Sequence, residues 1–154
     1  MTYTSFMVEY QKSAVVLVFN DNGELALQLR ASNDSSFPTH WHFSAGGGID
    51  PGEDSKLAIE RELREELGID ANVEFITEEH YTYPAWNPAV TREVDLFIYK
   101  CRHNGHFNPD QTEVERVEFF KLETIKKMIE SGVKFHPEFT LSWNKGIISQ
   151  AAIN

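Results

Sequence analysis

Apolar segments in the first third of the chain predict β-strands. Residues 14–19 form an apolar run rich in β-branched side chains, which ends at the turn sequence Asn-Asp-Asn-Gly of residues 20–23. Residues 24–30 then alternate between apolar and polar side chains, so the two segments together predict a β-hairpin. A short strand is expected over residues 41–45, directly before three consecutive glycines.

The period of the apolar positions changes to that of a helix over residues 55–67, where Ile59, Leu63 and Leu67 recur every four positions. Acidic residues precede this helix and Gly68 follows it, which is the expected capping pattern. Further strands are predicted over residues 73–83, 91–99 and 114–120, and helices over residues 122–131 and 138–151. This order predicts an α/β or α+β fold with a mixed sheet between helical layers, and residues 1–154 suit a single domain.

The charge of the chain restricts its partners. Acidic residues outnumber basic ones by 24 to 14, which gives a net charge of −10. Because so negative a surface repels phosphate groups, nucleic acids and anionic membranes are disfavoured as partners. A chain of this charge that handles phosphorylated small molecules would need metal cations between itself and its substrate.

The cysteine content and the N-terminus predict a cytoplasmic protein. The single cysteine, Cys101, excludes an intrachain disulfide and is expected to be a small buried residue. Residues 1–9 lack the basic region and the apolar stretch of a signal peptide. Residues 14–19 are too few to span a bilayer.

Three carboxylates gather on one face of the predicted helix over residues 55–67. Glu62, Glu65 and Glu66 are spaced i, i+3 and i+4. Like charges this close destabilise a helix, and Arg61 cannot neutralise all three, whereas Mg²⁺ or Mn²⁺ would remove the conflict. A solvated acidic face is the alternative. The strand and the glycine-rich loop before the helix favour a ligand site, because a glycine backbone can approach a ligand closely.

The segment from Gly47 to Ile69 resembles the Nudix box. The pattern of that family is Gly, five residues, Glu, seven residues, Arg-Glu, an aliphatic, any residue, Glu-Glu, any residue, Gly and an aliphatic. Every constrained position is filled in this chain, by Gly47, Glu53, Arg61, Glu62, Leu63, Glu65, Glu66, Gly68 and Ile69. So many matches at fixed spacing rarely coincide by chance, and the predicted hairpin before the box is also similar to the family's fold.

The resemblance implies an α/β/α sandwich that hydrolyses a nucleoside diphosphate linked to another group. It assigns the binding of Mg²⁺ or Mn²⁺ to Glu62, Glu65 and Glu66, with the backbone carbonyl of Gly46 as a further ligand. Metal ions that bridge a diphosphate neutralise charge on the leaving group and acidify the attacking water. Glu62 and Glu66 are therefore expected to take part in catalysis as well as in metal binding.

Other residues complete the catalytic set that the resemblance implies. The positions of Glu53 and Arg61 usually hold the loop and the helix together, so we assign these two residues a supporting role. Family members often add a carboxylate after the box, as a metal ligand or a general base. Glu113, just before a predicted strand, is the first candidate and Glu115 the second, with a solvated acidic loop as the alternative.

Four residues are candidates for binding the substrate. Arg30, at the end of a predicted strand, either meets a phosphate or pairs with a surface acid. Trp41 and Phe43 lie on one side of their strand, as core residues or as the wall of a pocket, and the core is favoured for Phe43. Trp86 lies in a proline-containing loop and is a candidate for stacking on the substrate. The six histidines show no tight ligand spacing, so no zinc site is expected.

Two segments are also similar to the isopentenyl diphosphate isomerase branch of the family, namely residues 37–41 and the Asn-Pro-Asp of residues 108–110. Those isomerases depend on a cysteine shortly after the tryptophan, where this chain has Phe-Ser-Ala over residues 43–45, and their box is degenerate. We therefore expect a pyrophosphohydrolase for a small-molecule diphosphate, with the isomerase and a non-catalytic nucleotide-binding module as alternatives. The second group on the diphosphate stays open, and so does the oligomeric state, for which a homodimer is one option.

Overall fold

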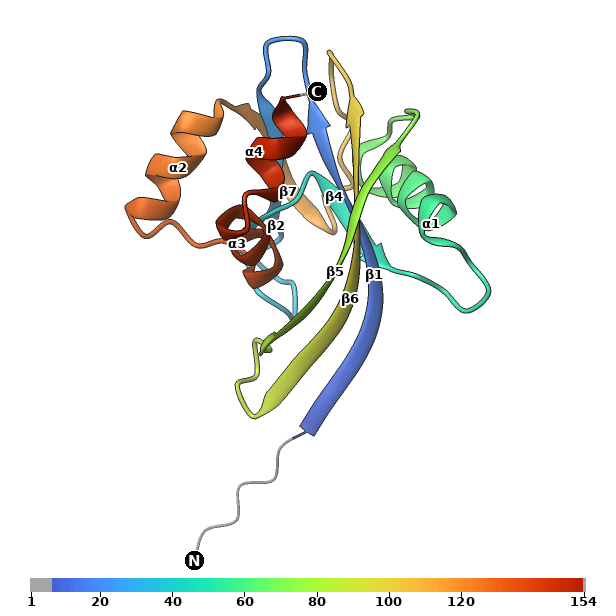
Figure 1. Ribbon diagram of the computed structural model, residues 1–154, viewed down its shortest axis with the longest axis vertical. Coiled ribbons are helices and arrows are strands. Elements are labelled where there is room, and N and C mark those ends of the chain that lie inside the picture. Colours follow the sequence, from blue (N-terminus) through green and yellow to red (C-terminus); the bar gives the residue numbers. More distant parts are fainter. Residues whose placement is uncertain (1–6, 154) are drawn as a thin grey trace, which may run out of the picture.

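The computed structural model describes residues 7–153, so most of the segment used in the signal-peptide argument lies outside the described residues. A seven-stranded sheet forms the centre of the molecule (Figure 1). Its strands are β1 (Met7–Phe19), β2 (Leu25–Arg30), β3 (Trp41–His42), β4 (Ala45–Gly48), β5 (Glu74–Pro84), β6 (Val90–Arg102) and β7 (Val114–Phe120). The helices are α1 (Ser55–Glu62), η1 (Leu63–Leu67), α2 (Leu122–Glu130), α3 (Pro137–Asn144) and α4 (Ile147–Ala152). Within residues 7–153, no helix is long and apolar enough to cross a membrane.

Strand β1 organises the sheet. It pairs in parallel with β6 along its whole length, from Met7 opposite Val90 to Phe19 opposite Arg102. The other pairings are antiparallel: β5 with β6, β4 with β1, and both β3 and β7 with β2. The sheet is therefore mixed, as the order of predicted elements indicated.

The hairpin predicted over residues 14–30 forms only around its turn. Strands β1 and β2 pair at one register position, Phe19 opposite Leu25. Before that position β1 pairs with β4, and after it β2 pairs with β7 and β3. The prediction placed both strands correctly but paired them mainly with each other, which was wrong. Their main partners come from later in the chain, and a local pattern contains no information about them.

The strand predicted over residues 41–45 is divided into β3 and β4 by Phe43 and Ser44. The buried side chain of Ser44 explains the division. Its hydroxyl accepts a hydrogen bond from the Val18 N–H at 2.9 Å and donates one to the Ala26 carbonyl at 2.5 Å. Ser44 thus ties β1 to β2 where the two strands separate, and the chain changes its pairing partner at this residue.

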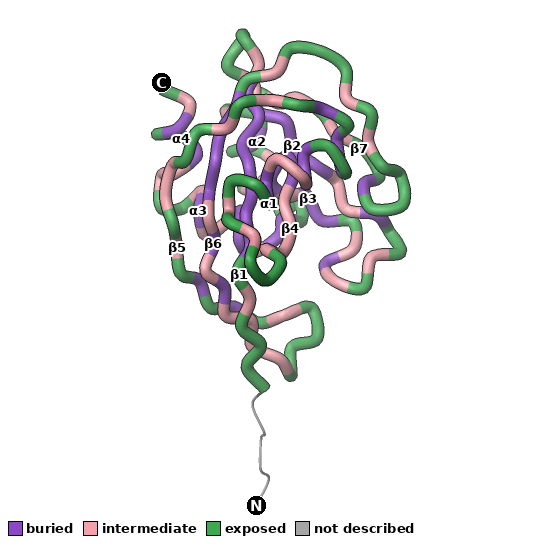
Figure 2. The backbone as a smooth tube through the Cα atoms, turned by 90° about the vertical axis from the view of Figure 1, so that its right-hand side faces the viewer, coloured by how far each residue is buried: buried purple, intermediate pink, exposed green. Residues whose placement is uncertain are grey.

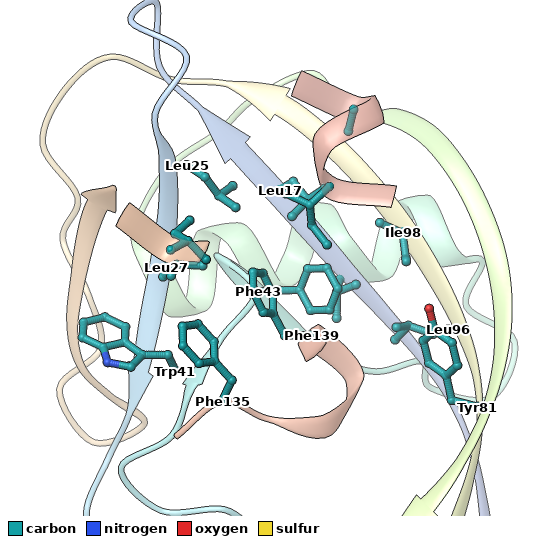
Figure 3. Close-up of a cluster of buried hydrophobic side chains, with 14 of the residues drawn as sticks. Leu17, Leu25, Leu27, Trp41, Phe43, Tyr81, Leu96, Ile98, Phe135 and Phe139 are labelled. Carbon is teal, nitrogen blue, oxygen red and sulfur yellow. The ribbon is translucent and has the colours of Figure 1, made fainter. Parts of the chain in front are cut away.

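Helices cover both faces of the sheet, with α1 on one side and α2, α3 and α4 on the other (Figure 1). Successive residues of β1 point to opposite faces of the sheet. Val16 therefore packs in the core on the α1 face, and Leu17 packs in the core on the face that α2, α3 and α4 cover. Figure 3 shows Leu17 in the second layer, with Phe43 beside Phe139 of α3. Figure 2 shows that β1 changes from exposed to buried along its length. The α/β/α sandwich is confirmed.

Two predicted helices are interrupted. The helix over residues 55–67 continues from α1 into η1, a π-helical turn, and Gly68 ends it in the left-handed conformation with φ +68°. The helix over residues 138–151 is divided into α3 and α4 at Gly146, where φ is +78°. A left-handed residue cannot continue a right-handed helix, which explains the division.

Candidate active site

A cavity of about 420 Å³ lies beside β4, and we call it the carboxylate cavity. Its lining includes Glu62 of α1, Glu66 of η1 and Glu113, which immediately precedes β7. The glycines of β4 line it as well. Its volume suits a small-molecule ligand. Carboxylates from two distant segments therefore converge on a glycine-rich strand.

Local features of α1 direct two of these carboxylates inward. The Asp54 side chain accepts a hydrogen bond from the Leu57 N–H at 2.8 Å and so begins the helix. Ile59 is fully buried and packs α1 against the sheet. Glu62 and Glu66 are only 8% and 7% exposed, so both carboxylates are held at the edge of this packed surface rather than in bulk water.

The glycines of β4 let the helix approach the sheet closely. A Cβ atom on Gly47 would lie 2.5 Å from Glu62 Oε1, so no other residue fits there without displacing the carboxylate. The Gly46 N–H donates to Glu66 Oε1 at 2.8 Å. Gln28 Nε2 lies 3.5 Å from the same oxygen.

Burial decides the protonation of these carboxylates. Together with a smaller effect of the negative charge of Glu113, it raises the pKa of Glu62 to about 7 and that of Glu66 to about 8. The two side chains therefore need a proton or a cation near neutral pH. Carboxylate oxygens, with backbone carbonyls nearby, are ligands that Mg²⁺ and Mn²⁺ prefer, so the residues of this cavity fit such an ion.

Arg61 connects the loop before α1 to the carboxylates. Its guanidinium donates to both oxygens of Glu53, at 2.9 and 3.0 Å, and to Glu62 Oε1 at 2.9 Å. This pairing lowers the pKa of Glu53. The geometry agrees with the supporting role that the sequence assigned to Glu53 and Arg61.

Glu65 differs from the other two box carboxylates. Its side chain is 56% exposed, accepts a hydrogen bond from Arg61 at 3.3 Å, and does not line the carboxylate cavity. The three acids therefore do not share one environment, and metal binding by Glu65 stays a prediction.

The structure separates the two candidates after the box. Glu113 lines the cavity, and its backbone carbonyl accepts a hydrogen bond from the Ala31 N–H at 3.2 Å, which fixes it beside the end of β2. Glu115 lies on β7 and is exposed outside the cavity lining. Arg30 pairs with Asp34 at 2.9 Å and also lines the cavity, and its binding of a phosphate stays a prediction.

The aromatic candidates are placed differently. Phe43 is buried in the core, and it also lines the cavity, so it occupies both of the places that the sequence left open for it. Trp41 is buried outside the cavity lining, where its ring packs edge-on against Phe120 and beneath the Arg116 guanidinium. Trp86 is 47% exposed and contacts the Phe37 ring, and it does not line the cavity. Binding of substrate by these residues stays a prediction.

Cys101 is buried, as expected. The spacing of the histidines along the chain indicated no zinc site, and that stays a prediction, but the fold brings ligand atoms of His42, His136 and Glu138 within 4.8 Å of one another in the cavity wall. Spacing did not predict this cluster, since its members come from β3 and from the start of α3. The sequence offered a signal for one member alone: His136 precedes Pro137, a residue that favours the first turn of a helix.

Comparison with known proteins identifies the family. The NUDIX domain model matches residues 9–142. An uncharacterized Nudix hydrolase of Listeria innocua is 30% identical over 134 residues, which cover 82% of this chain and 72% of the relative. An isopentenyl-diphosphate Delta-isomerase of Paenarthrobacter aurescens is 35% identical over 98 residues, 63% of this chain and 53% of the relative, so the match spans about half of that enzyme.

The fold also has solved counterparts. Protein DR0079 of Deinococcus radiodurans has a TM-score of 0.70 at 20% identity, and the likeness covers 84% of this chain and 78% of that chain. The segment that resembles the Nudix box contributes Gly47, Gly48, Glu62 and Glu66 to the lining of the carboxylate cavity. With a family model that matches residues 9–142, the chain belongs to the Nudix family.

Proposed function

We propose that this chain is a divalent-metal-dependent hydrolase that cleaves the diphosphate bridge of a nucleoside diphosphate linked to a second group, in the cytoplasm. The observation that carries the proposal is the convergence of Glu62, Glu66 and Glu113 on one cavity. Two of these carboxylates are buried and need a cation to be charged together near neutral pH.

The residues of the cavity have separate roles in this proposal. Glu62, Glu66 and the Gly46 carbonyl would hold the metal ion, and Arg61 orients Glu62. When bound, Mg²⁺ or Mn²⁺ supplies charge neutralisation on the diphosphate and lowers the pKa of water. Glu113 is placed to bind a further ion or to accept a proton from the attacking water, and Arg30 to bind a phosphate oxygen.

The isomerase is the second candidate, because an isomerase is 35% identical over 98 residues. The position of the single cysteine disfavours it. Cys101 packs in the core beneath α1 and does not line the carboxylate cavity, and burial raises its pKa to about 12. A thiol in that environment is unsuited to protonating a carbon of a substrate in the cavity.

A panel of diphosphates tests the proposal. We expect the protein to cleave at least one nucleoside diphosphate derivative, as measured by chromatography of the products. EDTA should abolish this cleavage, and added Mg²⁺ should restore it. Isopentenyl diphosphate in deuterated water should incorporate no deuterium. Isomer formation without cleavage of a phosphate bond would contradict the proposal, and Cys101→Ser would then show whether the thiol takes part.

A further inference from the structure

A second polar cluster lines the carboxylate cavity, outside the Nudix box. It consists of His42 of β3, Tyr83 of β5, and His136 and Glu138 at the start of α3. We call it the histidine wall. Tyr83 donates a hydrogen bond to Glu138 Oε2, and the Glu138 N–H donates to His136 Nδ1 at 3.1 Å. Contacts from two layers of the fold thus fix the wall in place.

The histidine wall has an unused hydrogen-bonding atom. Among the described residues, His42 Nδ1 is the buried side-chain nitrogen or oxygen without a hydrogen-bond partner. The other ring nitrogen, Nε2, lies 3.8 Å from Glu138 Oε1, too far for a hydrogen bond. His42 lines the carboxylate cavity, so a ligand there can bond to Nε2, whereas Nδ1 is fully buried behind the wall.

The geometry of the rings disfavours a metal ion as that ligand. The rings of His42 and His136 are stacked, with centroids 4.0 Å apart and planes inclined by 12°. A metal ion lies near the plane of each imidazole that binds it, and it cannot lie in two nearly parallel planes at once. In addition, His136 Nδ1 already accepts the hydrogen bond that caps α3.

The charges of the wall indicate what it can bind. Burial lowers the pKa of His42 and of His136 well below the usual value, so the stacked rings are neutral at pH 7. Burial also raises the pKa of Glu138, so the wall itself presents neutral rings and a carboxyl group, while Arg30 and Arg92 line other parts of the same cavity. A neutral imidazole has one N–H donor and one acceptor nitrogen, and Glu138 adds acceptor oxygens, so this surface can bond to a hydroxyl or amino group.

We propose that His42 and Glu138, held by His136 and Tyr83, bind the group attached to the diphosphate and select groups that carry hydroxyl or amino donors, such as a sugar or a nucleobase. The inference rests on the proposed function, since it concerns the substrate of that site. An apolar prenyl chain would cover His42 Nε2 and the Glu138 carboxyl group without forming a hydrogen bond to either. Sites built to hydrogen-bond a substrate reject analogues that lack the bonding group.

Matched substrates and variants test this selection. We expect His42→Phe to reduce kcat/KM for ADP-ribose about tenfold or more, mainly through KM, and to leave P1,P2-dihexyl diphosphate unchanged or better cleaved. Glu138→Gln should act in the same direction if His42→Phe does not fold. His106→Phe, in the exposed loop after β6, is the matched control and should change neither substrate.

Diadenosine diphosphate, which lacks the terminal ribose of ADP-ribose, distinguishes the two possible sources of hydrogen-bond donors, the terminal sugar and the adenosine. A loss with ADP-ribose alone assigns the terminal sugar to the wall, and an equal loss with both compounds assigns the adenosine that they share. A proportional loss with all three diphosphates, dihexyl included, would overturn the inference.

Calorimetric binding of the uncleavable α,β-methylene analogue of ADP-ribose separates this inference from the proposed function. Binding that weakens about tenfold in His42→Phe, in a protein that cleaves no diphosphate, would uphold the wall and reject the hydrolase. Unchanged binding in both variants would overturn the inference even if the enzyme is active. Stoichiometric Zn²⁺ binding to a Glu62→Gln/Glu66→Gln/Glu113→Gln variant, lost on adding His42→Phe, would make the wall a metal site and also overturn it.

Discussion

Glu66 is the side chain of the site in which burial most strongly opposes the negative charge. Its carboxylate is buried, accepts a hydrogen bond from the Gly46 N–H, and faces the charges of Glu62 and Glu113. The hydrogen bonds from the Gly46 N–H and from Gln28 do not offset the loss of water around a charge, so the pKa rises to about 8. The group is therefore protonated in part at neutral pH unless a cation takes the place of the proton.

Replacement of this carboxylate tests its role in turnover. Glu66→Gln keeps the shape of the side chain and removes the charge, so we expect an intact circular dichroism spectrum and turnover reduced roughly 100-fold or more, because even indirect partners of a metal site cost about 10- to 100-fold. The Mg²⁺ concentration for half-maximal rate should also rise. Glu115→Gln, on the exposed side of β7, is the control. Full activity of Glu66→Gln at limiting Mg²⁺ would remove Glu66 from the metal site.

The raised pKa also predicts how stability depends on pH without metal. A folded-state pKa of about 8 against the ordinary 4.5 means that the folded chain holds the proton more tightly than the unfolded chain. This contribution to the free energy of unfolding is complete below pH 4.5 and is lost as the pH rises through about 8. In urea unfolding with EDTA, the fall in stability from pH 5.5 to 8.5 should be smaller in Glu66→Gln than in the wild type. Parallel pH curves for the two proteins would show that Glu66 is ionised without cost.

At the scale of elements, the helix of the box is the best example of what local pattern can and cannot predict. Its start, its packed face and its end at Gly68 follow from residues within one segment, and all are as predicted. The π-helical turn η1 was not predicted, and it contacts a loop that lies outside the local pattern, since the Asn108 N–H donates to the Leu67 carbonyl at 2.8 Å. That loop is some forty residues further along the chain.

The same distinction applies to the site. The box residues were predictable since their spacing is fixed within one helix and its preceding loop. His42, Tyr83 and Glu138 come from three elements whose proximity depends on the whole sheet and on α3, so no short-range pattern reveals it. Ser44 illustrates the reverse case: a polar residue in an apolar strand marks the place where a strand changes partner.

Gly68 offers a test at this scale. Its φ of +68° disfavours any side chain, and a Cβ there would lie 3.0 Å from both the Asn108 Cβ and the Asn108 carbonyl oxygen. Gly52 has a similar φ of +80° with open space around it. Both Gly→Ala variants should lose about 1–2 kcal/mol from backbone strain, and Gly68→Ala should lose more, as measured by urea unfolding. Equal losses would mean that the Asn108 loop yields to the added methyl group.

For the molecule as a whole, the excess of acids makes stability depend on cations. The net charge is −10, and part of that charge is confined to the carboxylate cavity. Bound cations therefore relieve repulsion both at the surface and inside the cavity, and only the second effect is specific to the ion.

Magnesium should raise the melting temperature. Ligand at 100 times its Kd stabilises a fold by about 2.7 kcal/mol, which for a chain of this size corresponds to roughly 5–10 °C. The measurement is a calorimetric scan with EDTA or MgCl2, and NaCl at equal ionic strength is the control for surface screening. A Glu62→Gln/Glu66→Gln variant should lose the excess over NaCl. If that variant keeps the full magnesium effect, the stabilising ion lies elsewhere.

The parallel pairing of β1 with β6 has a consequence for synthesis on the ribosome. Every pair, from Met7 with Val90 to Phe19 with Arg102, joins residues far apart in the chain. The apolar residues 14–18, all buried in the finished protein, leave the ribosome long before their partner strand exists. Contacts of such separation form slowly, and an unpaired apolar strand is prone to associate with other chains. The nascent polypeptide therefore lacks the parallel partner of its central strand until about two thirds of the protein has been made, and we expect chaperones that shield extended apolar segments to bind it during that interval.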